Sequence, residues 1–122
     1  MRVLLAVIFS MILAGMLWVT IVASLERSVL DAGSELMKDA WFRATLVDAY
    51  FGFITFFVWV AYRETSWTAR VLWLIAILSL GNMAMAIYVL LQLRRANPDW
   101  PIYSLLLRPE HFSNRPMSAH PN

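Results

Sequence analysis

Three stretches of this sequence are long, apolar and almost free of formal charge, and they constrain the fold more than any other feature. Residues 3–24 contain no charged side chain, and neither do residues 71–93. An α-helix rises about 1.5 Å per residue, so about 20 apolar residues cross a hydrocarbon core of about 30 Å. Both stretches are therefore long enough to span a membrane.

The stretch between them is shorter. Residues 49–62 give about 21 Å of helix, which is too short to cross. Extension to residues 44–62 gives about 28 Å, but only if Asp48 lies inside the span. The sequence thus predicts an all-α membrane protein with three transmembrane helices, at about residues 3–24, 44–62 and 71–93.

Composition excludes several classes of protein. Hydrophobic residues make up 61% of the 122 residues and charged residues only 15%, against about half and about a quarter in soluble domains. A chain this small could not bury so many apolar side chains in a globular core. The absence of cysteine excludes disulfides and thiolate metal sites, and a net charge of +2 gives no reason to expect a nucleic-acid partner.

The connecting segments differ in character. Residues 25–43 predict a short amphipathic helix on the membrane surface, capped by Ser34, with a plain solvated loop as the alternative. All five prolines follow residue 97, where they prevent a continuing helix. We therefore expect a transmembrane domain at residues 1–97 with an interfacial first loop, and an extended Pro-rich tail at residues 98–122.

Basic residues give conflicting signals about orientation. In a three-span arrangement, seven lie on the side of the first loop and the tail, and three lie on the other side with the N-terminus. The basic leading flank of the first span, with Arg2, nevertheless favours a cytoplasmic N-terminus. The same segment resembles a signal peptide ending at residues 22–24, but its apolar run is longer than usual, so we expect a retained helix.

Polar residues inside predicted spans are costly and are candidates for function. Asp48 is the only ionisable one. Matched depths in a three-span bundle place Asp48 near Thr20 and near Tyr88 or Gln92, and place Asn82 level with Thr55. The structural alternatives are that Asp48 is an anchor near the interface and that Asn82 is a hydrogen-bonding link between helices. The functional alternatives are proton relay and ligand recognition.

Small and aromatic residues predict packing surfaces. Small side chains let a second helix backbone approach closely, and the candidates are Ala6, Ser10, Ala14, Gly52 and Gly81. The second span also carries an aromatic face formed by Tyr50, Phe53, Phe57 and Trp59. Aromatic faces stack on quinones, carotenoids or other isoprenoids, but they also pack against neighbouring helices, which is the interpretation we favour.

Catalytic and metal-binding patterns are missing from the predicted spans. Both histidines, His111 and His120, lie in the tail, which disfavours ligation of haem or chlorophyll within a span. No nucleophile with a base, no paired carboxylates and no glycine-rich phosphate loop occurs there. We therefore expect no catalytic residue, no metal and no intrinsic cofactor, with lipid, quinone or carotenoid as contacts only.

Three stretches resemble a known family. These are AGMLWVT at residues 14–20, DAYFGF at 48–53 and GNMAMAIY at 81–88. In them the chain is similar to a family of short three-helix membrane proteins of unknown function, found in bacteria with relatives in plants. The resemblance covers residues 1–93. It implies a bacterial inner or photosynthetic membrane and supplies no activity.

The leading functional hypothesis is a non-catalytic accessory or structural subunit of a larger membrane complex, with the bilayer and other membrane subunits as partners. The alternative is a small membrane protein that binds an isoprenoid or another lipid, or relays protons through Asp48. A partial enzyme that works only with a partner subunit is the third possibility.

Overall fold

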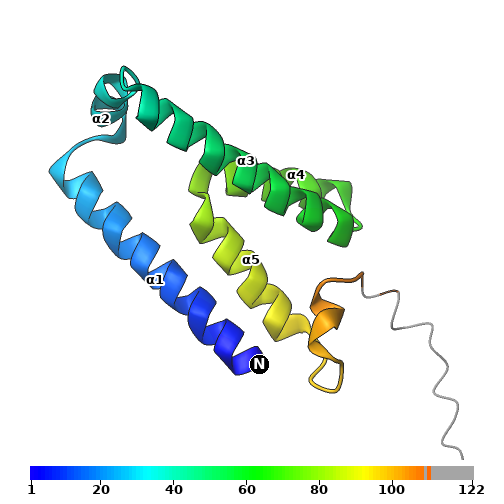
Figure 1. Cartoon of the computed structure of the whole chain (residues 1–122). Coiled ribbons are helices and arrows are strands. Elements are labelled where there is room, and N and C mark those ends of the chain that lie inside the picture. Colours follow the sequence, from blue (N-terminus) through cyan, green and yellow to red (C-terminus); the bar gives the residue numbers. More distant parts are fainter. Residues whose placement is uncertain (109, 111–122) are drawn as a thin grey trace, which may run out of the picture.

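A computed structural model describes residues 1–108 and residue 110. Within these residues the chain is helical and contains no strand, so the expectation of an all-α fold is confirmed. Five α-helices follow in order, and a 3-10 turn, η1 (Ile102–Leu105), comes after them. Figure 1 shows α1 and α5 running side by side, with α3 and α4 forming a second pair that diverges from them.

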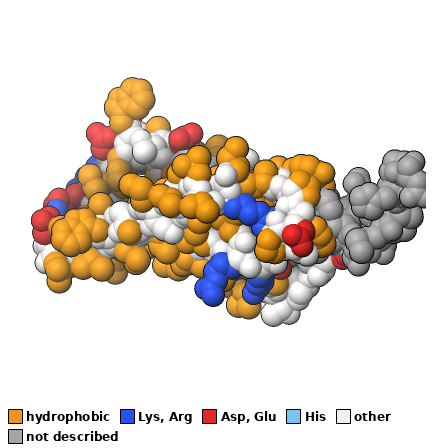
Figure 2. Space-filling model, turned by 90° about the horizontal axis from the view of Figure 1, so that it is seen from below, with side chains coloured by type: hydrophobic (Ala, Val, Ile, Leu, Met, Phe, Trp, Pro, Cys, Tyr) orange, Lys and Arg blue, Asp and Glu red, His pale blue; other side chains and the backbone are white. Residues whose placement is uncertain are grey.

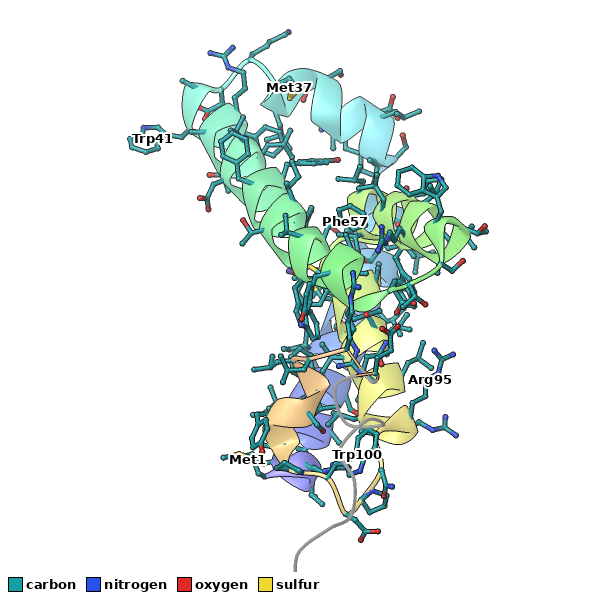
Figure 3. All side chains as sticks on the ribbon, turned by 90° about the vertical axis from the view of Figure 1, so that its right-hand side faces the viewer. Met1, Met37, Trp41, Phe57, Arg95 and Trp100 are labelled. Carbon is teal, nitrogen blue, oxygen red and sulfur yellow. The ribbon has the colours of Figure 1, made fainter. Side chains whose placement is uncertain are left out.

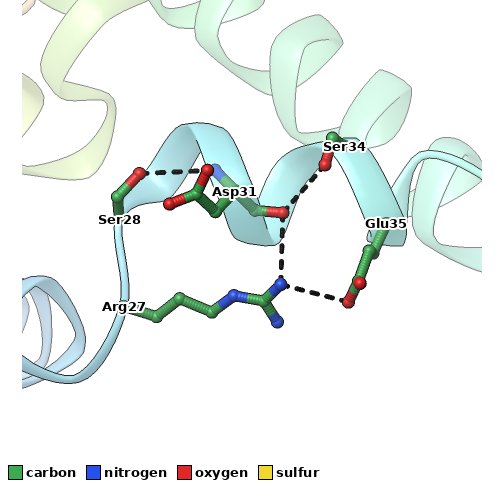
Figure 4. Close-up of polar contacts among 5 residues, drawn as sticks. All are labelled: Arg27, Ser28, Asp31, Ser34 and Glu35. Atoms are coloured by element: carbon green, nitrogen blue, oxygen red, sulfur yellow. Dashed lines mark hydrogen bonds and ion pairs between the residues drawn. The ribbon is translucent and has the colours of Figure 1, made fainter.

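The first helix, α1 (Arg2–Glu26), includes the whole first predicted span. The short helix α2 (Val29–Leu36) follows, and its cap is Ser28, whose hydroxyl accepts a hydrogen bond from the Asp31 amide at 3.3 Å. The expected helix after Ser34 is therefore placed wrongly. Ser34 lies inside α2 and donates to the Asp31 carbonyl, while Arg27 pairs with Glu35 at 3.2 Å (Figure 4).

The second long helix, α3 (Ala40–Arg63), begins four residues earlier than the predicted span. Asp39 is its N-cap, and its carboxylate accepts from the Phe42 amide at 2.8 Å, which satisfies one of the free amides of the first turn. Asp48 lies within this helix, as the length argument required. At 24 residues α3 is about 36 Å long.

The third predicted span is not one helix. It divides into α4 (Trp67–Leu80) and α5 (Asn82–Arg95), each of 14 residues and about 21 Å long. Gly81 separates them with φ 54 and ψ −126, a conformation that is open to glycine and strained for other residues. Its amide donates to the Ile77 carbonyl and its carbonyl accepts from the Met85 amide, so the break leaves both groups bonded.

The two halves form a helical hairpin whose apex is Gly81. Its arms meet at the rings of Trp73 and Tyr88, whose centroids are 4.8 Å apart, and its apex lies against the Phe53 ring at mid-height of α3. Both open ends of the hairpin therefore lie at the C-terminal end of α3. In Figure 3, Met1, Arg95 and Trp100 accordingly lie at one end of the molecule, and Met37 and Trp41 at the other.

The prediction of three transmembrane helices is therefore wrong. Two helices, α1 and α3, are long and apolar enough to cross a membrane by length and composition, and α4 is a shorter apolar helix. Hydropathy marked residues 71–93 as one span because glycine does not interrupt an apolar run. The positive φ of Gly81 reverses the chain there instead. The predicted boundary between domain and tail, at residue 97, stays a prediction.

The buried core is small and belongs to the hairpin and α3. It consists of Val60, Ile77, Ala84 and Tyr88, with aromatic side chains of α3 and Trp73 packed around them. α1 contains no buried residue. Figure 2 shows hydrophobic side chains spread over most of one face of the molecule, with Lys and Arg side chains near its centre.

The hairpin predicts an unusual sensitivity at Gly81. A Cβ atom there would lie 2.7 Å from Cζ of Phe53, and the backbone conformation is strained for alanine whatever the space. We expect Gly81→Ala to lower the free energy of unfolding in detergent by more than about 2 kcal/mol. Chemical unfolding followed by circular dichroism measures this change.

The matched control is Gly15→Ala in α1, where no atom lies within 4 Å of the new methyl group. That variant should be neutral or more stable by about 0.5–1 kcal/mol, because alanine is the better helix former. Equal stability of the two variants would contradict the proposed role of the Gly81 turn.

Candidate functional site: a buried polar cluster at the open end of the hairpin

Tyr88 lies at the centre of the cluster and is fully buried. Its ring makes edge-on contacts with three aromatic rings, those of Phe56, Trp59 and Trp73, at centroid distances of 6.2, 5.5 and 4.8 Å. Such perpendicular pairs place the positive edge of one ring on the negative face of the next. The cage fixes the direction in which the Tyr88 hydroxyl points.

That hydroxyl points at Glu64, which directly follows α3. Oε1 of Glu64 accepts a hydrogen bond from Oη of Tyr88 at 3.0 Å and a longer one from Nε2 of Gln92 at 3.4 Å. The Glu64 backbone carbonyl accepts from Nε of Arg70 at 2.9 Å. Glu64 therefore contacts both arms of the hairpin: its backbone carbonyl binds Arg70 of α4, and its side chain binds Tyr88 and Gln92 of α5.

Arginines tie the C-terminal segment to the same end. Nη1 of Arg63 donates to the Leu107 carbonyl at 3.3 Å, and Nε of Arg108 donates to the Tyr62 carbonyl. The Arg108 guanidinium also lies over the Tyr62 ring, 5.0 Å from its centroid, in a cation–π contact. Residues 102–108 are thereby held against α3.

Arg2 makes the corresponding connection from α1. Its guanidinium donates to three backbone carbonyls just beyond α5, those of Ala96, Asn97 and Trp100, at 3.3, 2.7 and 2.7 Å. Basic side chains commonly bind the free carbonyls at the C-terminus of a helix. The first and last parts of the described chain therefore meet at one end of the fold.

Two polar cavities and one apolar groove surround this cluster. A cavity of about 280 Å³ is lined by Arg63, Glu64, Thr65, Gln92, Arg95 and Glu110. A second polar cavity, of about 240 Å³, is lined by the same Arg63, Gln92 and Arg95. Its other lining residues lie after α5 and are Ala96, Asn97, Trp100 and Ser104. The groove, of about 520 Å³, lies between α1, α3, α5 and η1 and is almost wholly apolar.

The predicted polar cluster is only partly brought together. Tyr88 and Gln92 are buried and share a partner, but that partner is Glu64. The other four residues lie apart from it and are exposed: Asp48, Thr20, Asn82 and Thr55. Thr55 donates to the Phe51 carbonyl of its own helix at 2.8 Å.

The change of partner follows from the turn at Gly81. In a continuous third span, Tyr88 and Gln92 reach the depth of Asp48, near the start of α3. Because the chain reverses at Gly81, α5 runs back and brings them to the other end of α3, beside Glu64. Glu64 lies between two predicted spans, at residues 44–62 and 71–93, and was therefore assigned no role from the sequence. The available signal was an acidic residue directly after a long apolar helix.

The predicted packing residues fall into two groups. Ala6 and Ser10 line a hollow together with Leu90 and other residues of α5, and Gly81 lies against Phe53. Ala14 faces an open part of the α1 surface, and no atom lies within 4 Å of a Cβ built on Gly52.

The aromatic face of α3 packs mainly inward. Phe53, Phe57 and Trp59 lie against the buried core, and Nε1 of Trp59 donates to the Leu106 carbonyl at 3.3 Å. Tyr50 is more exposed, and its ring contacts Phe53 edge-on at 5.6 Å. Residues 1–108 and 110 contain no group of three or more side chains suited to hold a metal ion.

Comparison with known proteins gives a family and no activity. Residues 1–113 match the family described as "Protein of unknown function (DUF1475)". No curated protein and no solved structure matches the chain. The expected likeness to a family of unknown function is confirmed at this level.

The contact between Tyr88 and Glu64 predicts a measurable loss of stability. Tyr88→Phe keeps the aromatic cage but leaves Oε1 of Glu64 with only the longer bond from Gln92. We expect it to lower the free energy of unfolding by about 1–3 kcal/mol, the cost of leaving a partly buried hydrogen-bond acceptor poorly satisfied. Denaturant titration in detergent measures the loss.

Tyr50→Phe is the matched control, because its hydroxyl is on an exposed residue and makes only a 3.5 Å contact with the Leu78 carbonyl. It should change stability by less than about 0.5 kcal/mol. A Tyr88→Phe variant as stable as this control would show that the hydroxyl bond contributes nothing.

Proposed function

We propose that this chain, which belongs to the DUF1475 family of proteins of unknown function, is an integral membrane protein and a non-catalytic accessory subunit of a larger membrane complex. The observation that carries this proposal is α1, which has no charged side chain between its first and last residues and has no buried residue. A helix of this kind needs an apolar environment on several sides. Lipid and other membrane subunits can provide it.

The exposed side chains of the two long helices support the membrane location. Met11 and Trp18 of α1 are 70% and 72% exposed, and Phe51 of α3 is 65% exposed. Each Å² of apolar surface left in water costs about 25 cal/mol. Exposed apolar surface of this extent is typical of membrane and protein interfaces.

A hollow on α1 supports a protein partner in addition to lipid. Val3, Ala6, Val7, Ser10, Met11 and Ala14 line an open depression of about 440 Å³ on the outer surface of this helix. Small residues there allow a second backbone to approach closely, and Ser10 can donate a hydrogen bond across the interface. α1 packs against α5 and leaves this depression uncovered by the described residues.

The arginines support a cytoplasmic N-terminus. Because the hairpin returns α5 to its starting end, one end of the fold carries Arg2, Arg63, Arg70, Arg94, Arg95 and Arg108. Among residues 1–108 and 110, the other end carries only three basic residues, Arg27, Lys38 and Arg43, together with four acidic residues. Positive residues concentrate on the cytoplasmic side of membrane proteins. Residue 108 should accordingly lie on the same side as the N-terminus.

A second candidate function, lipid or isoprenoid binding, is favoured by the apolar groove. Its walls include Leu5 and Phe9 of α1, Phe56 of α3 and Leu105 of η1, and its volume of about 520 Å³ is in the range of small-molecule sites. The groove suits a hydrocarbon chain. A proton relay through Asp48 gains no such support, because that carboxylate is exposed and has no partner within residues 1–108 and 110.

Reporter fusions test the arrangement in the membrane. A cytoplasmic reporter should be active when fused after residue 108 and inactive when fused after residue 35, whereas a periplasmic reporter should give the reverse. A three-span protein with a cytoplasmic N-terminus would place both positions outside the cytoplasm. Periplasmic activity after both residue 35 and residue 108 would therefore reject the hairpin arrangement, whereas periplasmic activity after residue 108 alone would reverse the proposed orientation.

Native mass spectrometry of the chain released gently from membranes tests the two candidate functions. An accessory subunit should appear with other membrane proteins at fixed stoichiometry. An Ala14→Leu variant should lose them, because Ala14 lines the outer depression and not the hollow beside α5, while Ala44→Leu in α3 serves as the control for an exposed alanine. A lone chain that retains lipid would reject the subunit role and favour the second candidate.

A further inference from the structure

We propose that the cavity between α5 and η1 binds a phosphate group, and that the phosphate belongs to an anionic membrane lipid. This cavity, of about 240 Å³, is the one lined by Arg63, Gln92, Arg95, Asn97, Trp100 and Ser104. The lipid source rests on the proposed membrane location. The anion site itself rests only on side chains that line the cavity, above all Arg63, Arg95 and Ser104.

The first observation is a buried guanidinium that makes no ion pair within the described residues, although the Glu64 carboxylate lines the adjoining cavity with it. Arg63 is only 8% exposed, and one of its N–H groups donates to the Leu107 carbonyl. Within residues 1–108 and 110 the only ion pair is the distant Arg27–Glu35 pair. A buried charge is costly unless it is paired. The guanidinium therefore has donors available to an anion, and it lines the cavity.

The second observation is an unused hydroxyl. Ser104 is 5% exposed, and its Oγ is buried without a hydrogen-bond partner. Buried polar atoms are nearly always bonded to protein, water or ligand. Because Ser104 lines the same cavity as Arg63, a bound oxyanion can accept from both, which would satisfy each of them.

The neighbouring groups select an anion with several oxygen atoms. Arg95 adds a second guanidinium, and Gln92, which is 6% exposed, adds an amide. The planar guanidinium of arginine can donate two parallel hydrogen bonds to a phosphate or a carboxylate, and a tetrahedral phosphate can accept hydrogen bonds from several donors at once. The carboxylates of Glu64 and Glu110 line the adjoining cavity, and Oε1 of Glu64 is bonded to Tyr88 and Gln92.

The position of the cavity favours a lipid as the source of the phosphate. η1 separates it from the apolar groove, since Ser104 lines the cavity while Ile102 and Leu105 line the groove. The site also lies at the arginine-rich end of the fold, which we assign to the cytoplasmic side. Basic pockets at that level bind the headgroups of anionic lipids.

Calorimetric titration of the full chain in maltoside detergent tests the proposal. The probes are dihexanoyl phosphatidic acid, dihexanoyl phosphatidylcholine and inorganic phosphate. We expect saturable binding of phosphatidic acid, at least tenfold tighter than either other probe. Arg95→Gln and Ser104→Ala should each weaken this binding at least fivefold. Both positions are chosen because neither substitution leaves a new buried charge unpaired.

Control variants separate a specific site from a general effect of charge. Arg43→Gln removes an exposed arginine at the opposite end, and Ser34→Ala removes an exposed hydroxyl of α2; each should change the affinity less than twofold. The site is rejected if phosphatidic acid does not saturate, or if these controls weaken binding as much as Arg95→Gln does. Equal affinity for inorganic phosphate would overturn the lipid source and keep the anion site.

Failure of this proposal can be distinguished from failure of the proposed function. The reporter fusions and the native mass spectra measure insertion and partners without any added phosphate. A thermal shift with phosphatidic acid provides a second readout, because a ligand that binds only the folded chain raises its unfolding temperature. Absence of that shift in the intact protein would count against the site even if the reporters place the chain as expected.

Discussion

The chain reversal at Gly81 is the constraint on which the other features depend. A positive φ at one residue turns an apolar stretch that could cross a membrane into two short helices that meet at an angle (Figure 1). The ring of Phe53 fills the space that any side chain at this position would need. The turn also sets the direction of α5. That direction determines which residues of α5 contact the end of α3, and it places the segment after α5 beside the N-terminus of α1.

The polar cluster is a direct result of this reversal. Tyr88 and Gln92 reach Glu64 only because α5 returns to the C-terminal end of α3. The same return brings the carbonyls after residue 95 to the N-terminal end of α1, where the Arg2 guanidinium donates hydrogen bonds to them. Charges that conflict in a three-span arrangement then separate into an arginine-rich end and a mixed end. The orientation that we propose thus depends on a turn of the backbone and not on a change in composition.

Sequence reasoning succeeded where the signal is local. The lengths of the two long helices follow from their charge-free runs, although the start of α3 was placed at residue 44 and not at residue 40, and neither Ser28 nor Asp39 was recognised as a cap. It failed at Gly81, because hydropathy measures the affinity of side chains for lipid and carries no information about backbone direction. The error then passed to Asp48, which was paired with Tyr88 and Gln92 by depth. It also left Glu64 and Ser104 without a role, since neither lies in a predicted span.

The sequence by itself determined that the chain is helical, that it contains long apolar stretches and that Asp48 belongs to a long helix. These properties depend on the composition and spacing of neighbouring residues, which fix helix formation and the preference for an apolar environment. Only the tertiary structure decided which helices are neighbours, where the arginines gather and which buried groups lack partners. Those properties depend on contacts between residues far apart in the chain, and here the backbone geometry of one glycine determines which of those contacts form.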